Sequence, residues 1–206
     1  ANTARNGGLA IVGPNFLGVT NNVDGMMLHM LFAREALRFC KDSRPGVAFV
    51  GPNGGLLGHL QPAADGPGLP LSYVISTGNE SDLGVGEFLD YMVQDAATDV
   101  ILLFVEGIRD TEKFLAAARR AAEIGKPVIV TKVGRSGAGE RAAASHTASM
   151  AGWSAAYDAV FAKYGFIVSN DLDEAVTIAA VLTTNPLPKG DRVAVLTVSG
   201  GGGLLG

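Results

Sequence analysis

Five short apolar runs, each followed by a polar or glycine-rich turn, constrain the fold of this chain more than any other feature. Within each run Val, Ile, Leu and Phe follow one another with little polar alternation. Such runs are typical of strands that are buried on both faces of a parallel sheet. We therefore predict strands over GVAFV (46–50), LSYVIST (71–77), DVILLFVE (99–106), PVIVTKV (127–133) and FIVS (166–169).

Segments with helical spacing alternate with these runs. The clearest, 111–125, is rich in good helix formers, with Thr111 as a candidate cap and Gly125 at its end. Further helices are predicted over 85–95, 154–165 and 171–184. Strand–helix units in this order predict an α/β fold with a doubly wound parallel sheet of Rossmann or flavodoxin type.

Composition and charge argue against several classes of protein. The net charge is −4 and Lys and Arg form no long block, so a nucleic-acid partner is not expected. No apolar run reaches the roughly 18 residues that span a bilayer, and the first residues lack the apolar segment of a signal peptide. The single cysteine, Cys40, excludes a disulfide within the chain. We therefore expect a cytoplasmic protein without a membrane partner.

Both ends of the chain are expected to belong to neighbouring domains. The segment 8–21 predicts a strand and loop without a preceding partner unit, and 191–206 predicts a strand and a turn into a further helix. The segments 47–58 and 193–206 also share an apolar strand, a glycine-rich turn and GGLLG. We expect a fragment of a larger protein, and this pair is weak support for two related domains in tandem.

Two glycine-rich turns between a strand and a helix are candidate anion sites. One contains Asn53, Gly54 and Gly55, and the other contains Gly201 and Gly202. Backbone N–H groups at the positive end of a helix are a ready site for phosphate. Neither turn continues into the Lys-Ser/Thr pair of a Walker A loop, so a close-packed turn without a ligand is the alternative.

His146 lies in a long segment, 132–152, whose second half is rich in Ala, Ser and Gly. Loops of this length inside a compact domain are usually functional or disordered. On spacing alone, His146 is either an exposed bystander or a nucleophile that moves between sites. Glu106 ends a predicted strand, and it is either a solvent-facing carboxylate or the group that orients a histidine by accepting its ring N–H.

The remaining titratable residues favour solvent-facing or structural roles. We expect Asp82 and Asp110 to be solvated and His59 to be structural. The methionines around His29, within 26–30, predict packing, and no metal site is expected in this chain.

These segments, taken in order, resemble one family. The chain contains GPNFLGV, GVAFVGPNGGLLG, STGNESDLGVGEFLDYM, DVILLFVEGIRD, KPVIVTKVGRSGAGERAAASHTASMAG and RVAVLTVSGGGGLLG. Through essentially its whole length it is similar to the NDP-forming acyl-CoA synthetases, the relatives of succinyl-CoA synthetase and of ADP-forming acetyl-CoA synthetase. The most specific part of the resemblance is KVGRS followed by SHT and AG.

The resemblance implies an architecture. Residues 43–186 would form a flavodoxin-like, succinyl-CoA synthetase-like ligase domain that carries the phosphohistidine loop. Residues 1–42 would be the C-terminal tail of a CoA-binding Rossmann-like domain and a linker, and 187–206 the first strand and turn of a second, truncated ligase domain. An ATP-grasp domain or subunit would lie outside this chain, and the whole enzyme could be a homo- or hetero-oligomer.

The resemblance also implies a chemistry. A carboxylic acid, CoA and ATP with Mg²⁺ would give acyl-CoA through an acyl phosphate and a phosphohistidine at His146. Glu106 would hydrogen-bond this histidine, and the turns at 53–55 and 201–202 would hold the phosphate at two helix ends. The segment STGNESD, with Gly78 and Asn79, would line the carboxylate pocket. CoA and ATP would be bound mainly by absent domains, so this chain alone would be inactive.

One turn departs from the family pattern. Many relatives have Ser-x-Ser-Gly where this chain has GPNGG, so Asn53 can cap a helix but supplies no hydroxyl to a phosphate. Some relatives also use this scaffold in a regulatory module fused to an acetyltransferase. A CoA- or nucleotide-sensing module without ligase activity is therefore the alternative function.

Overall fold

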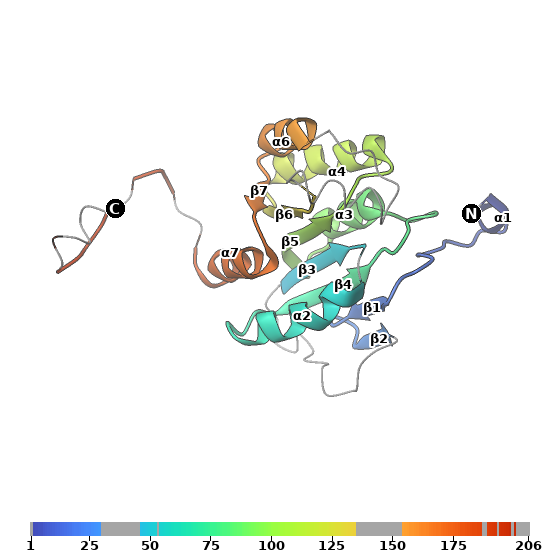
Figure 1. Ribbon diagram of the computed structural model, residues 1–206, viewed down its shortest axis with the longest axis horizontal. Coiled ribbons are helices and arrows are strands. Elements are labelled where there is room, and N and C mark those ends of the chain that lie inside the picture. The colour runs from blue at the N-terminus through green and yellow to red at the C-terminus, as the bar shows by residue number, and fades with distance from the viewer. Residues whose placement is uncertain are drawn as a thin grey trace.

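The computed structural model describes residues 2–29, 46–52, 54–134, 154–186, 189–192, 194–198 and 200. The strands in these residues form one sheet in the order β2-β1-β4-β3-β5-β6-β7 (Figure 1). Their bounds are β1 Gly18–Asn21, β2 Met26–His29, β3 Gly46–Gly51, β4 Leu71–Ser76, β5 Thr98–Val105, β6 Val128–Lys132 and β7 Ile167–Ser169.

The strands from β3 to β7 are all parallel to their neighbours within this set. Numbered along the chain from β3, they lie in the order 2-1-3-4-5, which is the order of flavodoxin-like doubly wound sheets. The predicted α/β fold class is therefore confirmed. All five predicted strands form within a residue of their expected bounds.

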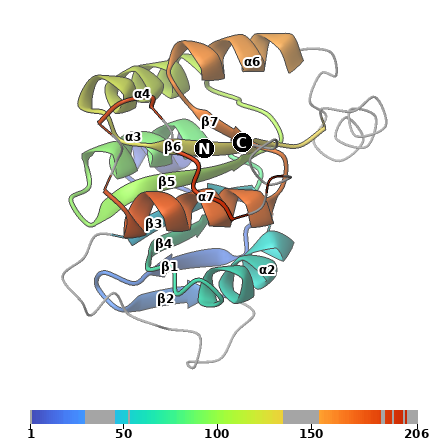
Figure 2. The same ribbon diagram turned by 90° about the vertical axis from the view of Figure 1, so that its left-hand side faces the viewer.

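Helices cover both faces of the sheet, with α3, α4 and α6 on one side and α2 and α7 on the other (Figure 2). Alternate residues of a strand enter opposite apolar layers: Ala48 and Val50 pack under α3 and α4, and Val47 and Phe49 pack under α2 and α7. Because both layers are apolar, the strands read as uninterrupted apolar runs. The helix bounds are α1 Asn2–Asn6, α2 Gly54–Asp65, α3 Val85–Gln94, α4 Thr111–Ile124, α6 Ser154–Lys163 and α7 Leu172–Thr184.

The cap of α4 lies one residue before the expected one. The side chain of Asp110, not of Thr111, accepts the Lys113 N–H at 3.1 Å. At the other end Gly125 adopts a left-handed conformation with φ of 70°, as a helix stop requires. The expectation of Thr111 as the cap is therefore wrong: Thr111 is already the first residue of the helix, and the carboxylate of the preceding Asp110 accepts the N–H group three residues on.

A hairpin at the edge of the sheet was not expected from the sequence. The strand β1 pairs antiparallel with both β2 and β4, so residues before 43 join the sheet of the following domain. The side chain of Asn21 accepts the N–H groups of Val23 and Asp24, each at 3.0 Å, and so shapes the turn between β1 and β2. The division of the chain at residue 43 stays a prediction.

The strand expected at the beginning of 191–206 is not formed by the residues that the structure describes. Residues 194–198 adopt neither strand nor helix, and the side chains of Leu196 and Val198 are fully exposed. A strand needs a neighbour to satisfy its backbone hydrogen bonds, and none of the described strands pairs with this segment.

We predict that Gly46→Ala destabilises the fold by about 1–3 kcal/mol, because the added methyl group has no room. A Cβ atom at this position would lie 2.6 Å from the carbonyl oxygen of Pro70, just before β4, and 2.9 Å from the amide nitrogen of Ser72, within β4. Urea unfolding measures the free energy of unfolding. Gly190→Ala is the matched control, since a Cβ there meets no atom within 4 Å; equal stability of the two variants would contradict the prediction.

Candidate functional site

The carboxyl ends of the parallel strands meet at one edge of the sheet, and the order of the strands reverses between β3 and β5. From β3 the chain adds β4 on one side and then crosses to add β5 on the other. In open α/β sheets, ligands bind at such a switch point, outside the carboxyl ends of the strands. We therefore place the candidate site at this edge, where β3 leads into α2 and β5 leads into Glu106.

The helix α2 begins at Gly54, close to the end of β3. It is 12 residues long, and its first turn has no acidic side chain that would compete with an anion for the N–H groups. A Cβ atom at Gly54 would lie 2.5 Å from the Leu17 Cβ, so glycine at this position lets Leu17 pack against the start of the helix. Gly54 is half-buried and Gly55 is exposed. This helix end has the chemistry to bind a phosphate group.

Glu106 follows β5 directly and is half-buried. The residue before it is held by the neighbouring strand, since the Val133 N–H donates to the Val105 carbonyl oxygen at 3.1 Å. Because β3 and β5 are hydrogen-bonded neighbours, Glu106 and the start of α2 follow adjacent strands at the same edge. The structure thus brings a predicted carboxylate and a predicted anion-binding helix end to the switch point.

Gly78 and Asn79 follow β4, the other neighbour of β3, and the N-terminal segment lies against them. The Asn79 N–H donates to the Pro14 carbonyl oxygen at 2.8 Å, and the Asn15 side-chain amide donates to Asn79 Oδ1 at 3.3 Å. Gly78 has a φ of 61°, and a Cβ atom there would lie 2.3 Å from the same Pro14 oxygen. Only glycine accommodates both the conformation and the contact.

Glu80 is a further residue of this loop that the sequence analysis did not single out. Its backbone has a φ of 51°, which is unusual for a non-glycine residue. Burial raises the pKa of the Glu80 carboxyl above its usual value, although the Thr77 hydroxyl donates to the carboxylate at 2.9 Å. Glu80 lies within the quoted segment STGNESD, but nothing in that segment indicates that its carboxyl is partly buried. A Cβ atom at Gly84, just before α3, would lie 2.7 Å from Glu80 Oε2.

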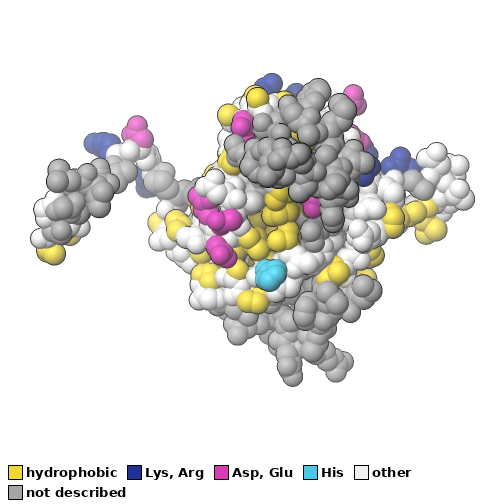
Figure 3. Space-filling view, in the orientation of Figure 1, with side chains coloured by type: hydrophobic (Ala, Val, Ile, Leu, Met, Phe, Trp, Pro, Cys, Tyr) yellow, Lys and Arg dark blue, Asp and Glu magenta, His cyan; other side chains and the backbone are white. Residues whose placement is uncertain are grey.

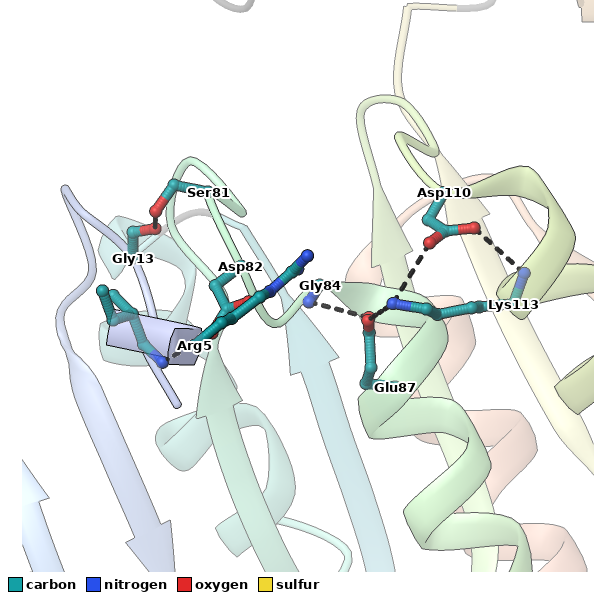
Figure 4. Close-up of polar contacts among 9 residues, drawn as sticks. Arg5, Gly13, Ser81, Asp82, Gly84, Glu87, Asp110 and Lys113 are labelled. Carbon is teal, nitrogen blue, oxygen red and sulfur yellow. Dashed lines mark hydrogen bonds and ion pairs between the residues drawn. The ribbon is translucent and has the colours of Figure 1, made fainter. Parts of the chain in front are cut away.

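Asp82 was expected to be solvated, and this expectation is wrong for its carboxylate. The side chain is only 4% exposed. It accepts the Ile11 N–H at 2.9 Å and forms an ion pair with Arg5 (Figure 4). The Ile11 N–H and the Arg5 guanidinium lower the pKa of the Asp82 carboxyl below its usual value of 3.8. Asp82 therefore fastens the N-terminal segment to the loop that follows β4.

Asp110 is partly exposed, as expected, with 45% of its side chain accessible. Besides capping α4 it lies 3.2 Å from the Lys113 ammonium, which also pairs with Glu87 at the start of α3. Glu87 in turn accepts the Gly84 N–H at 3.0 Å (Figure 4). The chain of contacts joins the first turns of α3 and α4 at the carboxyl edge of the sheet.

Four predicted site residues, Asn53, His146, Gly201 and Gly202, lie outside the described residues. Their approach to Glu106 stays a prediction. His59 was expected to be structural, but it is exposed on the surface of α2.

A groove between α2 and α7 lies on the face where Figure 3 shows apolar side chains beside acidic ones. Glu106 and the start of α2 do not line it, so the candidate site is distinct from this groove. The groove is lined by Ala63, Pro67, Asp173, Val176, Thr177, Ala180, Val181 and Thr184.

Among the described residues no group of three metal-ligating side chains comes together, and no helix there has the length and apolar character to cross a membrane.

Comparison with known proteins gives a consistent family. The succinyl-CoA ligase like flavodoxin domain matches residues 44–182. The chain is 36% identical over 198 residues to the acetate–CoA ligase [ADP-forming] II subunit alpha of Pyrococcus furiosus, covering 96% of this chain and 41% of that protein. It is 36% identical over 194 residues to the trans-feruloyl-CoA synthase FCS1 of an unknown prokaryotic organism, covering 94% of this chain and 27% of that protein.

A solved structure agrees with these relatives. The dinucleotide forming acetyl-coenzyme A synthetase 1 of Ca. Korarchaeum cryptofilum, in complex with phosphate and ADP, superposes with a TM-score of 0.84 at 33% identity. The match covers 98% of this chain and 42% of that protein. This chain therefore spans less than half the length of the relatives that it matches.

We predict that the Asp82 ion pair makes stability depend on pH. A lowered pKa in the folded state means that the carboxylate stabilises the fold above its ordinary pKa of about 3.8 and that this contribution is lost as the pH falls through the lowered value. Asp82→Asn should therefore lower the urea midpoint at pH 7 and should match the wild type in strong acid. Asp191→Asn, at an exposed position after α7, is the control and should leave the midpoint unchanged at both pH values. A deficit of Asp82→Asn that persists undiminished in acid would contradict the role of the charge.

Proposed function

The chain belongs to the family of succinyl-CoA ligase like flavodoxin domains, and from this premise we propose that it is part of an ADP-forming acyl-CoA synthetase. The observation that carries the proposal is the placement of Glu106 and the start of α2 on adjacent strands at the switch point. A carboxylate and a positive helix end are the two groups needed to hold a histidine and its phosphoryl group. The relatives named for acetate and for a feruloyl group indicate a carboxylic acid as the substrate class.

The proposed reaction transfers one phosphoryl group twice. A ring nitrogen of His146 attacks the terminal phosphorus of ATP and ADP leaves. The substrate carboxylate then attacks the phosphohistidine, which regenerates the imidazole and gives an acyl phosphate. The CoA thiol attacks the acyl carbon, its proton is lost and phosphate leaves. Acid, CoA and ATP thus give acyl-CoA, ADP and phosphate, and the solved relative in complex with phosphate and ADP is consistent with that balance.

Each site residue has a role in this proposal. Glu106 accepts a ring N–H of His146, which fixes the tautomer and makes the other nitrogen the nucleophile. The start of α2, with Asn53, Gly54 and Gly55, holds the phosphoryl group on one side, and the turn at 201–202 holds it on the other. The loop with Gly78 and Asn79 contributes to the pocket for the acid. The hydrogen bond from the Asn79 N–H to the Pro14 carbonyl oxygen and the close packing of Gly78 on the same oxygen fix this loop and support that role.

The complete enzyme requires parts that this chain does not supply. An ATP-grasp domain or subunit would bind ATP with Mg²⁺, and a CoA-binding domain would bind most of the CoA. The Pyrococcus furiosus relative is named as a subunit alpha, which supports a partner subunit in a hetero-oligomer. The reaction is expected in the cytoplasm, where ATP and CoA are available, and the isolated chain is expected to be inactive.

Labelling with γ-phosphate-labelled ATP tests the proposal on the full-length protein with its ATP-grasp partner. The wild type should take up an acid-labile, alkali-stable label, and His146→Ala should abolish it. Glu106→Gln should slow labelling by about 10²-fold or more, because the ring is no longer oriented by a charged acceptor. Glu123→Gln, at an exposed position near the end of α4, is the control and should label at the wild-type rate.

Two results would count against the proposal. Label that persists in His146→Ala would place the phosphoryl group on another residue. A wild type that takes no label would contradict the phosphohistidine and favour the CoA- or nucleotide-sensing alternative, for which binding of CoA without turnover is the expected signature.

A further inference from the structure

Tyr157, in the first half of α6, contacts two segments at the carboxyl edge of the sheet and the apolar layer under its own helix. Its hydroxyl accepts the Ile108 N–H at 3.3 Å. The Lys132 ammonium lies 5.0 Å from the centre of its ring. On the third side the ring lies 6.0 Å from the ring of Phe161, which is fully buried. One side chain thus joins the turn after β5, the end of β6 and the apolar layer under α6.

The contact with Ile108 bears directly on Glu106, two residues earlier. On one side of Glu106 the Val105 carbonyl is held by the Val133 N–H. On the other side the Ile108 N–H is held by the Tyr157 hydroxyl. Ile108 also packs against the same apolar layer as Tyr157. The backbone that carries the Glu106 carboxylate is therefore fixed at both ends.

The contact with Lys132 joins the two ends of the segment that contains His146 in the sequence. Lys132 is the last residue of β6 and is in register with Val105, the last residue of β5. Tyr157 lies in the helix that follows this segment. An ammonium group over an aromatic face is an attractive contact, and Lys132 also donates to the Val133 carbonyl oxygen.

The hydroxyl of Tyr157 distinguishes it from a residue that only packs in the apolar layer. The ring is half-buried against apolar residues, and phenylalanine would fill that space equally well, as Phe114, Phe161 and Phe166 do elsewhere in the same layer. A phenol in such a place usually satisfies a polar partner. Here the partner is the backbone of the turn that begins at Glu106.

Resting on the proposed function, we infer that Tyr157 is a positioning residue of the phosphoryl-transfer site, which holds the turn after β5 so that Glu106 presents its carboxylate to the histidine. It acts through the backbone of Ile108 and through its stacking under Lys132. It does not itself touch the reacting groups. Its loss should therefore slow the step that needs an oriented histidine and leave substrate affinity unchanged.

The test compares Tyr157→Phe with Tyr164→Phe in the full-length enzyme. Tyr164 is also half-buried in the same apolar layer and has a lysine ammonium, that of Lys163, 5.5 Å from its ring centre. Tyr157→Phe should lower the rate of histidine phosphorylation and kcat about tenfold with KM for ATP unchanged, the effect expected for one lost hydrogen bond. Tyr164→Phe should match the wild type in both constants.

A double variant shows whether Tyr157 acts through Glu106. In a Glu106→Gln background, Tyr157→Phe should cause no further loss of rate, because the carboxylate that it positions is already gone. Losses that multiply in the double variant, or a Tyr157→Phe enzyme with wild-type kcat, would overturn the inference.

Amide hydrogen exchange at Ile108 gives a readout that does not depend on activity. Exchange should be about tenfold faster in Tyr157→Phe than in the wild type, because the N–H loses its acceptor. If the wild type forms no phosphohistidine, the proposed function fails, and faster exchange at Ile108 would still support Tyr157 as the anchor of the turn. Unchanged exchange at Ile108 would overturn that anchor whether or not the enzyme is phosphorylated.

Discussion

The pairing of β3 with both β4 and β5 is the constraint on which the rest of the molecule depends. The side chains of residues 47–50 are fully buried, and alternate residues feed the two apolar layers. Burial on both faces needs helices on both faces, and parallel strands need helical crossovers to connect them. Because β3 lies between β4 and β5, the connection from β3 leads to one side of it and the connection from β4 crosses to the other side. The switch point between β3 and β5 is therefore a consequence of the core.

The pairing of the core strands is enough to bring the groups of the candidate site together. Glu106 and the start of α2 reach the same edge because their strands are hydrogen-bonded neighbours. The loops at this edge are held by polar contacts with distant parts of the chain. Asn79 donates to Pro14, Asp82 accepts from Ile11 and Arg5, and the Tyr157 hydroxyl accepts from Ile108. The partners in the contacts of Asp82 and Tyr157 are 49 to 77 residues apart in the sequence. These contacts hold the loops at the edge, while apolar packing holds the strands.

Local sequence was enough to predict the five parallel strands and most of the helices, because a strand buried on both faces leaves an uninterrupted apolar run. The same reasoning found Glu106 as a strand-end carboxylate and Gly54 as the start of a helix. It failed for Thr111, where a neighbouring Asp caps the helix, and for Asp82, whose burial depends on residues near the N-terminus. It also missed the hairpin of β1 and β2, because each strand is only four residues long and the apolar residues of β2 indicated packing and not a strand.

The sequence by itself determined the fold class, the family and the kinds of chemical group available, since apolar periodicity, glycine-rich turns and the motif around His146 are properties of the chain alone. Only the tertiary structure decided which strands became neighbours and which polar groups became partners. The order of the sheet placed Glu106 beside the strand that leads into α2, and the packing of α6 placed the Tyr157 hydroxyl on the turn after β5. Such contacts join residues far apart in the chain, so their geometry follows from three-dimensional packing and leaves no local pattern to read.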